Sequence, residues 1–330
     1  MIWLAWRQHR KKLLFTLVGF AALAALMVPI GLAMRHTYTD LGLPECARQL
    51  AAGGQPSGPG DSCEQAFNRF TNRYGALNLV AVLLLILPML VGMFWGAPLV
   101  AREVEQGTHR FAWTQGVGRR HWALVQFGLA GGVTVAFAVL YGLGMSWWID
   151  PLIHATREGR LGVVTFDLQG VVPIGYTLFA VALGIFAGTF WRRVLPAMAV
   201  TLLGFVAVRL ALTTLVRPHY LPPRTFTAPV VDPTGGHGPP RGAWELAAGV
   251  RNADGRMVAP DSWVACPPGG KGPEGRACGA DLGLDPGAYN WMQYQPADRF
   301  WPFQYIETGI FVALAALLFY FAVRRIRRIA

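Results

Sequence analysis

The amino-acid sequence predicts an all-α integral membrane protein with six transmembrane helices and both termini in the cytoplasm. Of its 330 residues, 53% are hydrophobic and only 14% are charged, whereas about 25% are charged in an ordinary soluble domain. The mean hydropathy of +0.36 excludes intrinsic disorder. Apolar runs long enough to cross a bilayer, which takes about 20 residues per helix, occur six times along the chain.

The six predicted spans are nearly free of charge, since only Arg209 and Glu307 lie inside them. Basic residues precede the first span, as they precede the apolar core of a signal peptide. That core is about 7 to 15 residues long, whereas this run has 21 residues, so we expect an uncleaved anchor. The predicted spans are residues 13–33, 76–100, 122–149, 171–191, 194–216 and 305–323.

Alternate connections between the spans differ in their content of Lys and Arg. One set holds 14 basic residues within 42 positions, and the other holds 14 within 151 positions together with 15 acidic residues. The positive-inside rule places the first set in the cytoplasm. The first set comprises residues 1–12, 101–121, 192–193 and 324–330, and the second comprises residues 34–75, 150–170 and 217–304.

This topology also accounts for the net charge of +11. A basic chain can indicate nucleic-acid binding, but here the positive charge follows the membrane sidedness, so we expect no nucleic-acid partner. The chain is rich in Ala, Gly and Arg and has only three lysines, a composition that a bacterial genome of high G+C content produces. We therefore expect a multi-pass protein of the bacterial plasma membrane, in contact with membrane lipid.

The chain divides into three predicted parts. Residues 1–216 hold the first five spans and the cytoplasmic connection 102–121, residues 217–304 form an external segment, and residues 305–330 hold the sixth span and a basic cytoplasmic tail. The external segment is dense in Gly and Pro, so turns should dominate it. We expect a short helix near residues 244–250, and the aromatic run 289–305 at the outer membrane interface, where Trp and Tyr are enriched.

All four cysteines lie in the segments assigned to the outside, which is the oxidising side. Each of the two long external segments can close one bridge, and we expect disulfides between Cys46 and Cys63 and between Cys266 and Cys278. The alternative is a metal site that includes a nearby histidine, but no CxxC or HxxxH spacing supports it. We therefore expect no metal site.

The connection 102–121 holds the only two acidic residues on the predicted cytoplasmic side, Glu103 and Glu105. Gly107 follows them and can end a helix, while Arg119 and Arg120 would return the chain to anionic headgroups. The exposed aromatic residues of this connection leave two alternatives open, a docking surface for a partner or a solvated loop packed on headgroups.

The same residues carry a resemblance to a known family. A Glu103-x-Glu105-x-Gly107-Thr108 signature after the second span, then Trp113-Thr-Gln115 and a paired Arg119-Arg120 before the third, resembles the membrane (permease) subunits of type-2 ABC transporters. The first ten residues, with Trp3, Trp6, Arg7 and Arg10, resemble the amphipathic N-terminal helix that lies on the inner leaflet in this family. Residues 294–307 are similar to the approach to the last span in actinobacterial members.

The resemblance implies that residues 102–121 form the coupling helix, which contacts a separate cytoplasmic ABC ATPase, present in two copies, that hydrolyses ATP with Mg. The implied coupling residues are Glu103, Glu105, Gly107, Thr108, Trp113 and Gln115, and the implied membrane-surface anchors are Trp3, Trp6, Arg7, Arg10, Arg119 and Arg120. The chain itself lacks a phosphate-binding loop of the kind that binds ATP. The nearest candidate, Gly269-Gly-Lys-Gly272, has no hydroxyl residue after its lysine. We therefore expect a transport subunit without an enzymatic activity or a cofactor of its own.

Two features within the spans leave alternatives open. Arg209 would cost about 2.5 to 3.5 kcal/mol alone at mid-membrane, so it pairs with Glu307, snorkels to the outer surface, or lines a substrate pathway. Three glycine pairs with GxxxG spacing serve either packing within the subunit or a dimer seam. These pairs are Gly92 with Gly96, Gly128 with Gly132 and Gly184 with Gly188.

The function predicted from the sequence is that of the permease subunit of an ATP-driven exporter. Six spans are few for a complete pathway, so a second copy of the chain, giving a homodimer, or a related permease should complete it. The apolar spans permit a hydrophobic or amphipathic substrate. The alternatives are a non-transporting membrane sensor or immunity protein and, with less support, a membrane enzyme, for which no convergent set of titratable residues is present.

Overall fold

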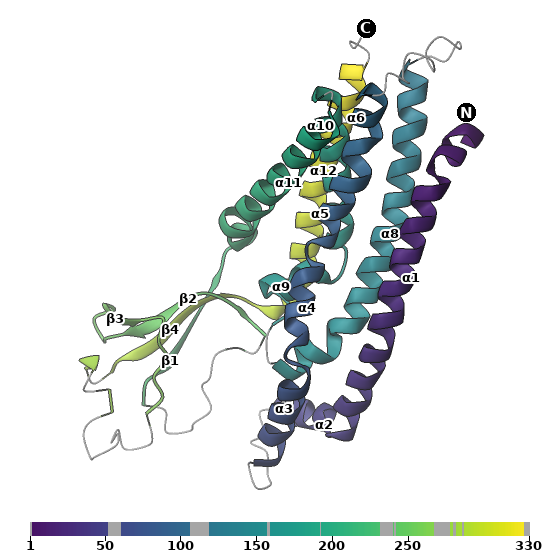
Figure 1. Cartoon of the computed structure of the whole chain (residues 1–330). Coiled ribbons are helices and arrows are strands. Elements are labelled where there is room, and N and C mark those ends of the chain that lie inside the picture. Colours follow the sequence, from purple (N-terminus) through teal and green to yellow (C-terminus); the bar gives the residue numbers. More distant parts are fainter. Residues whose placement is uncertain are drawn as a thin grey trace.

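The computed structural model describes residues 2–51, 61–105, 119–156, 159–191, 193–231, 240, 242–266, 278–279, 282–285 and 287–326. Long helices form a bundle, and a small β-sheet extends from one end of it (Figure 1). The six predicted spans are confirmed: within the described ranges, six helical runs are long and apolar enough to cross a membrane. These runs are Leu14–Asp40, Leu77–Arg102, Phe127–Ala155, Val172–Phe190, Val194–His219 and Ala297–Ile326.

Three of the six spans, the second, the fifth and the sixth, are built from more than one helical element. The bundle consists, in chain order, of α1 (Ile2–Asp40), α2 (Leu43–Ala51), α3 (Asp61–Tyr74), α4 (Leu77–Leu84), α5 (Leu87–Val91), the π-helical turn η1 (Gly92–Gly96), α6 (Ala97–Glu105), α8 (Arg119–Thr156), α9 (Val163–Leu168), α10 (Val172–Phe190), α11 (Val194–Ala211), the π-helical turn η2 (Leu212–Val216), the 3₁₀ turn η3 (Arg217–His219), the 3₁₀ turn η6 (Ala297–Arg299) and α12 (Phe300–Ile326). The predicted N-terminal amphipathic helix and the first span form one continuous helix, α1.

The two termini lie at the same end of the bundle, as an even number of spans requires (Figure 1). We call this the terminus end. The short helices α2 and α3 and the β-sheet lie at the opposite end, the sheet end. Both predicted disulfides, Cys46 to Cys63 and Cys266 to Cys278, are present, and both belong to segments at the sheet end.

The second span is interrupted at Pro88, and the break has a local cause. Proline has no backbone N–H, so the carbonyl of Leu84, four residues earlier, has no partner within the helix. The Tyr141 hydroxyl on α8 donates to this carbonyl at 2.8 Å. A guanidinium N–H of Arg209 on α11 donates to the next carbonyl, that of Leu85, at 3.1 Å. Side chains of two other spans thus satisfy the backbone that the break exposes.

Helix α10 is the centre of the bundle. In its most apolar window 78% of the residues are buried, against 11% for the span that contains α11. A Cβ added at Gly92 would lie 2.5 Å from the Ala180 carbonyl, and one at Gly184 would lie 2.5 Å from the Gly92 carbonyl. The first and third GxxxG pairs therefore bring α10 and the second span together within the subunit. An added Cβ at Gly128 or Gly132 would meet nothing within 4 Å.

Residues 217–304, which were predicted to form an external segment dominated by turns, differ from this prediction. They hold a four-stranded antiparallel sheet with strand order β1-β4-β2-β3, so the chain is mostly rather than entirely helical. The strands are β1 (Arg224–Pro229), β2 (Trp244–Arg251), β3 (Met257–Pro260) and β4 (Tyr289–Gln295). The prediction of a short helix near residues 244–250 is wrong. These residues belong to β2, which pairs along both edges, with β3 and with β4. The first part of the aromatic run 289–305, which was predicted for the membrane interface, forms β4, one of the two inner strands of the sheet.

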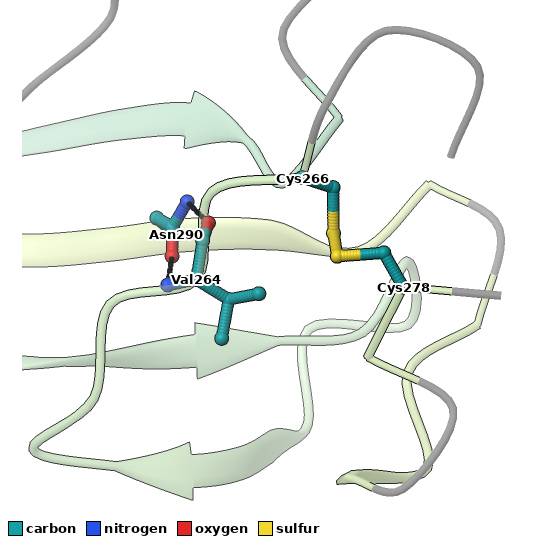
Figure 2. The surroundings of a disulfide bond; sticks show 4 residues. All are labelled: Val264, Cys266, Cys278 and Asn290. Carbon is teal, nitrogen blue, oxygen red and sulfur yellow. Dashed lines mark hydrogen bonds between the residues drawn. A yellow bond between two sulfur atoms is a disulfide. The ribbon is translucent and has the colours of Figure 1, made fainter. Parts of the chain in front are cut away.

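The far end of the sheet is closed by the second disulfide (Figure 2). Cys266 is buried among apolar side chains that include Val230 and Val250. Beside the disulfide, the side-chain amide of Asn290 on β4 donates to the carbonyl of Val264 at 2.8 Å and accepts from its N–H at 2.9 Å. This two-way bond holds the segment after β3 against the sheet without a further strand.

Candidate functional site

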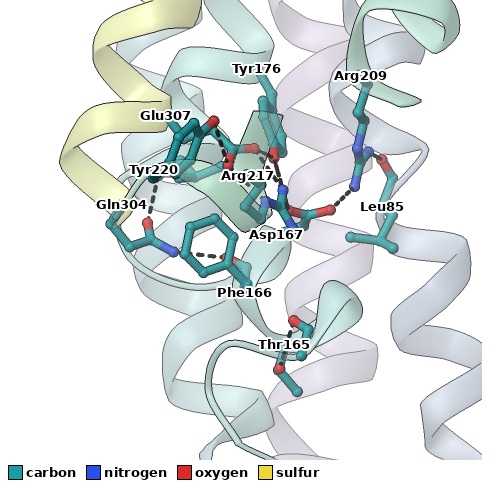
Figure 3. Close-up of polar contacts among 12 residues, drawn as sticks. Leu85, Thr165, Phe166, Asp167, Tyr176, Arg209, Arg217, Tyr220, Gln304 and Glu307 are labelled. Carbon is teal, nitrogen blue, oxygen red and sulfur yellow. Dashed lines mark hydrogen bonds and ion pairs between the residues drawn. The ribbon is translucent and has the colours of Figure 1, made fainter. Parts of the chain in front are cut away.

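Ionisable side chains from five elements meet inside the bundle near the sheet end (Figure 3). We call this group the charge network, and it consists of Asp167 on α9, Tyr176 on α10, Arg209 on α11, Arg217 on η3 and Glu307 on α12. Arg217 and Glu307 are 0% exposed and Asp167 is 3% exposed. A buried charge is tolerated in this position only if it is paired.

Arg217 is the centre of the charge network. Its Nε donates to Glu307 Oε2 at 2.8 Å, and its Nη2 donates to Glu307 Oε1 at 2.6 Å. This two-point contact matches the planar guanidinium to the carboxylate. The same Nη2 lies 2.6 Å from Oδ1 of Asp167, and the guanidinium carbon lies 4.5 Å from the ring centroid of Phe166. Arg217 thereby joins α9 and α12 to the end of the fifth span.

Asp167 is shared between two arginines. Its second oxygen, Oδ2, accepts from Nη2 of Arg209 at 2.6 Å. The Tyr176 hydroxyl lies between the two carboxylates, 2.8 Å from Asp167 Oδ1 and 2.5 Å from Glu307 Oε1. Two cations and two anions balance formally, which reduces the cost of removing the group from water.

Neutral side chains surround the charge network and fix its geometry. The Gln304 amide oxygen accepts from the N–H groups of Val171 and Val172 at 3.0 Å each, and its Nε2 donates to the Phe166 carbonyl at 2.9 Å. Gln304 thus holds the turn between α9 and α10. Gly170 in that turn has φ +65, and a Cβ there would lie 2.6 Å from the Gln304 oxygen, so this position requires glycine.

The β-sheet is attached to the turn that carries Arg217. Gln295, at the end of β4, donates to the carbonyls of Pro218 at 3.0 Å and Leu221 at 2.7 Å. The Tyr220 hydroxyl lies 3.2 Å from Glu307. Burial, with the Glu307 carboxylate beside it, raises the pKa of the Tyr220 phenol, so this group remains a neutral donor. The turn that carries Arg217 is therefore held between β4 and α12.

The prediction that Arg209 pairs directly with Glu307 is wrong. Both residues belong to the charge network, but Arg209 pairs with Asp167 and Glu307 pairs with Arg217. Sequence analysis assigned Asp167 and Arg217 to external segments and missed their role. The signal was present in both cases, because Asp167 interrupts an apolar run beside the fourth span and Arg217 directly follows the apolar run of the fifth.

Two of the six predicted coupling residues, Glu103 and Glu105, are described, and they lie on α6 at the terminus end (Figure 1). Gly107, Thr108, Trp113 and Gln115 lie outside the described residues. Glu103 and Glu105 belong to α6, and the side chain of Glu103 is not among those described. Oε2 of Glu105 accepts from the N–H of Val194, the first residue of α11, at 3.1 Å. A carboxylate at this position satisfies a free N–H at the helix N-terminus and interacts favourably with the helix dipole.

The predicted membrane-surface anchors are described by their backbone alone. Trp3, Trp6, Arg7 and Arg10 form part of α1. Arg119 and Arg120 begin α8.

In the part of the chain that the structure describes, no group of three or more His, Cys, Asp or Glu side chains is placed to hold a metal ion.

Residues 17–217 match the family model described as ABC-2 membrane transporter related. The match covers more than half of the chain and runs from the first span to Arg217. The chain belongs to the ABC-2 membrane transporter related family. The resemblance to permease subunits of type-2 ABC transporters is therefore confirmed, and with it a multi-pass membrane protein of a transport family. No curated protein and no solved structure matches the chain.

The region matched by the family model contains four of the five residues of the charge network. Asp167, Tyr176, Arg209 and Arg217 lie inside the matched region, whereas Glu307 and the β-sheet lie beyond it. ABC-2 membrane subunits generally work with a cytoplasmic ATPase. The charge network thus connects the family's membrane region to a sheet and a last span that the family match does not include.

Proposed function

We propose that this ABC-2 family member is the permease subunit of an ATP-driven exporter in the bacterial plasma membrane. In this proposal the terminus end faces the cytoplasm and the sheet end faces outward. Two copies of a separate ABC ATPase hydrolyse ATP with Mg, and a second copy of this chain or a related permease completes the pathway. The substrate is hydrophobic or amphipathic, in keeping with the apolar spans. The basic residues of the terminus end and the two disulfides of the sheet end support this sidedness.

The observation that carries the proposal is the way α11 is held. At the terminus end its first N–H is bound by Glu105, which lies on the helix that leads into the connection 102–121. At the sheet end it continues through η2 to Arg217, and both Arg209 and Arg217 are fixed in the charge network. Between these ends the span is mostly unburied within the subunit. Helix α11 is thus suited to transmit a movement from one end to the other.

These contacts suggest that α11 moves as a lever. Binding of ATP by the partner would displace the connection 102–121, and Glu105 would pass the displacement to the start of α11. The charge network would act as the pivot, because breaking a buried ion pair by removing one partner costs about 3 to 5 kcal/mol. The terminus end of α11 would then swing relative to α10 and α12, opening or closing a path along the exposed apolar face of α11.

The coupling role can be tested with Glu105→Ala in the reconstituted complex of permease and ATPase. We expect normal assembly with the ATPase, and a several-fold loss of the change in ATPase rate that the permease causes. Glu105→Gln keeps an oxygen acceptor for the Val194 N–H and should retain more of this response. Glu45→Ala, which alters an exposed glutamate at the sheet end, is the matched control. Unchanged coupling in Glu105→Ala, or failure of the permease to bind any ABC ATPase, would contradict the proposal and favour a sensor.

The proposed sidedness can be tested with single cysteines. The four native cysteines are paired in disulfides, so an introduced thiol is the reactive one. In intact cells, Gly236→Cys should react with a membrane-impermeant maleimide and Thr108→Cys should react only after lysis. The reverse pattern would invert the topology.

A further inference from the structure

A cavity lies among the first three spans, apart from the charge network. Its volume is ≈ 530 Å³. Its wall is formed by α1, by α5 and η1, by α8 and by one residue of α10, and includes Gly19, Leu23, Pro88, Phe94 and Phe137. Pockets of about 300 to 1,000 Å³ with mostly apolar walls are typical of small-molecule sites.

The polar groups of the wall are already bonded within the chain. The indole N–H of Trp95 donates to Thr16 at 3.1 Å, and the Tyr141 hydroxyl donates to the carbonyl that Pro88 leaves free. The hydroxyls of Thr134 and Thr177 donate to carbonyls of their own helices at 2.7 Å and 2.6 Å. A polar ligand group placed here would lose its hydrogen bonds to water and find no free donor in exchange. The cavity therefore suits an uncharged hydrocarbon group.

The cavity reaches the outer apolar surface of the spans. Phe94 and Leu90 belong to its wall and are 56% and 39% exposed. The neighbouring face of α1 is apolar as well, with Phe15 and Val18 exposed. Both faces lie within runs that are apolar enough to cross a membrane. A ligand would therefore enter sideways from the hydrocarbon core of the bilayer.

We propose that this cavity binds one acyl chain of a bilayer lipid, inserted between α1 and the η1 turn. The break at Pro88 and the wide π-helical turn displace the second span from the regular path of a helix, which leaves room for the chain between the spans. The site does not depend on the exporter function, since a lipid chain occupies it without ATP and without the partner subunit.

The test uses the full-length protein in nanodiscs that contain phosphatidylcholine with a diazirine in its acyl chain. After illumination, mass spectrometry should find the label concentrated on peptides of α1, η1 and α8 that form the wall. Gly19→Leu should lower this labelling several-fold, because an added Cβ at Gly19 meets nothing within 4 Å and the side chain can fill the cavity without displacing protein atoms. Val133→Trp fills the cavity from α8 and should have the same effect.

Gly128→Leu is the matched control. Its added Cβ also meets nothing within 4 Å, and Gly128 is not part of the wall, so labelling should not change. The proposal fails if both filling variants, folded as judged by gel filtration, retain full labelling of the wall, or if label spreads evenly over all lipid-facing peptides. It also fails if diazirine palmitate labels the wall while the phosphatidylcholine probe does not, because the occupant is then a free amphiphile.

Discussion

The two ends of α11 are held by different chemistry. At the sheet end, Arg209 and Arg217 are fixed by buried carboxylates, with four N–O distances of 2.6 to 2.8 Å. At the terminus end, the described polar contact is one hydrogen bond, which the Val194 N–H donates to the exposed carboxylate of Glu105. Buried charge pairs are costly to break, whereas an exposed cap contributes little. The proposed lever therefore assigns the fixed pivot to the sheet end of the fifth span and the movable attachment to its terminus end.

Among the residues that hold the two ends of the fifth span, replacement of Arg217 should have the largest effect on the free energy of unfolding. Arg217→Met leaves Glu307 buried without its cation, so we expect a loss of about 3 to 5 kcal/mol in the free energy of unfolding, measured by thermal denaturation in detergent micelles. Arg224→Met, at the exposed start of β1, is the control and should change little.

A second variant separates loss of the pair from loss of packing. The double variant Arg217→Met with Glu307→Met removes the unpaired carboxylate and should be more stable than Arg217→Met alone. If the single variant loses less than about 1 kcal/mol, the charge network is not a pivot.

Replacement of Arg209 should have an intermediate effect. In Arg209→Met the Asp167 carboxylate keeps Arg217 at 2.6 Å, and the variant loses a hydrogen bond to a charged group, worth about 1.5 to 3 kcal/mol. The carbonyl of Leu85 also loses its donor. The same unfolding measurement should rank this variant between Arg217→Met and wild type. A loss as large as that of Arg217→Met would make Arg209 the centre of the charge network instead.

Replacement of Glu105 should have the smallest effect on stability. Loss of an N-terminal cap costs about 0.5 to 2 kcal/mol, and Glu105 is exposed, so Glu105→Ala should lie near the lower limit in the same assay. Of the three variants, Glu105→Ala should nevertheless have the largest ratio of lost ATPase coupling to lost stability. If Glu105→Ala destabilises as much as Arg217→Met, the two ends of α11 are not different in kind.

The helical part of the fold could be predicted because a membrane span is a local property of the sequence. Each apolar run is long enough by itself, and the even number of spans places both termini together. The disulfides could be predicted for a similar reason, since each bridge closes a short separation of 17 or 12 residues.

The sheet and the charge network could not be predicted in the same way, because both depend on contacts between distant segments. Strand β2 is identified by its pairing with β4, which begins 45 residues later in the chain. The composition of β2 alone does not distinguish it from a helix. Arg209 and Glu307 are conspicuous as charges within spans, but their partners lie just beyond the apolar runs. Counting those positions as loop removed Asp167 and Arg217 from consideration.

The most direct test of the lever is a pair of distance measurements by electron spin resonance on the complex with its ATPase. One spin label is placed at Leu195, near the terminus end of α11, and the other at Leu317 on α12, both exposed positions. A second sample carries labels at Leu215, near the sheet end, and Leu317. Labelled chains are diluted with unlabelled chains so that distances within one subunit dominate. We predict that ATP binding shifts the Leu195 distance and leaves the Leu215 distance unchanged; equal shifts in both, or no shift at Leu195, would contradict the lever.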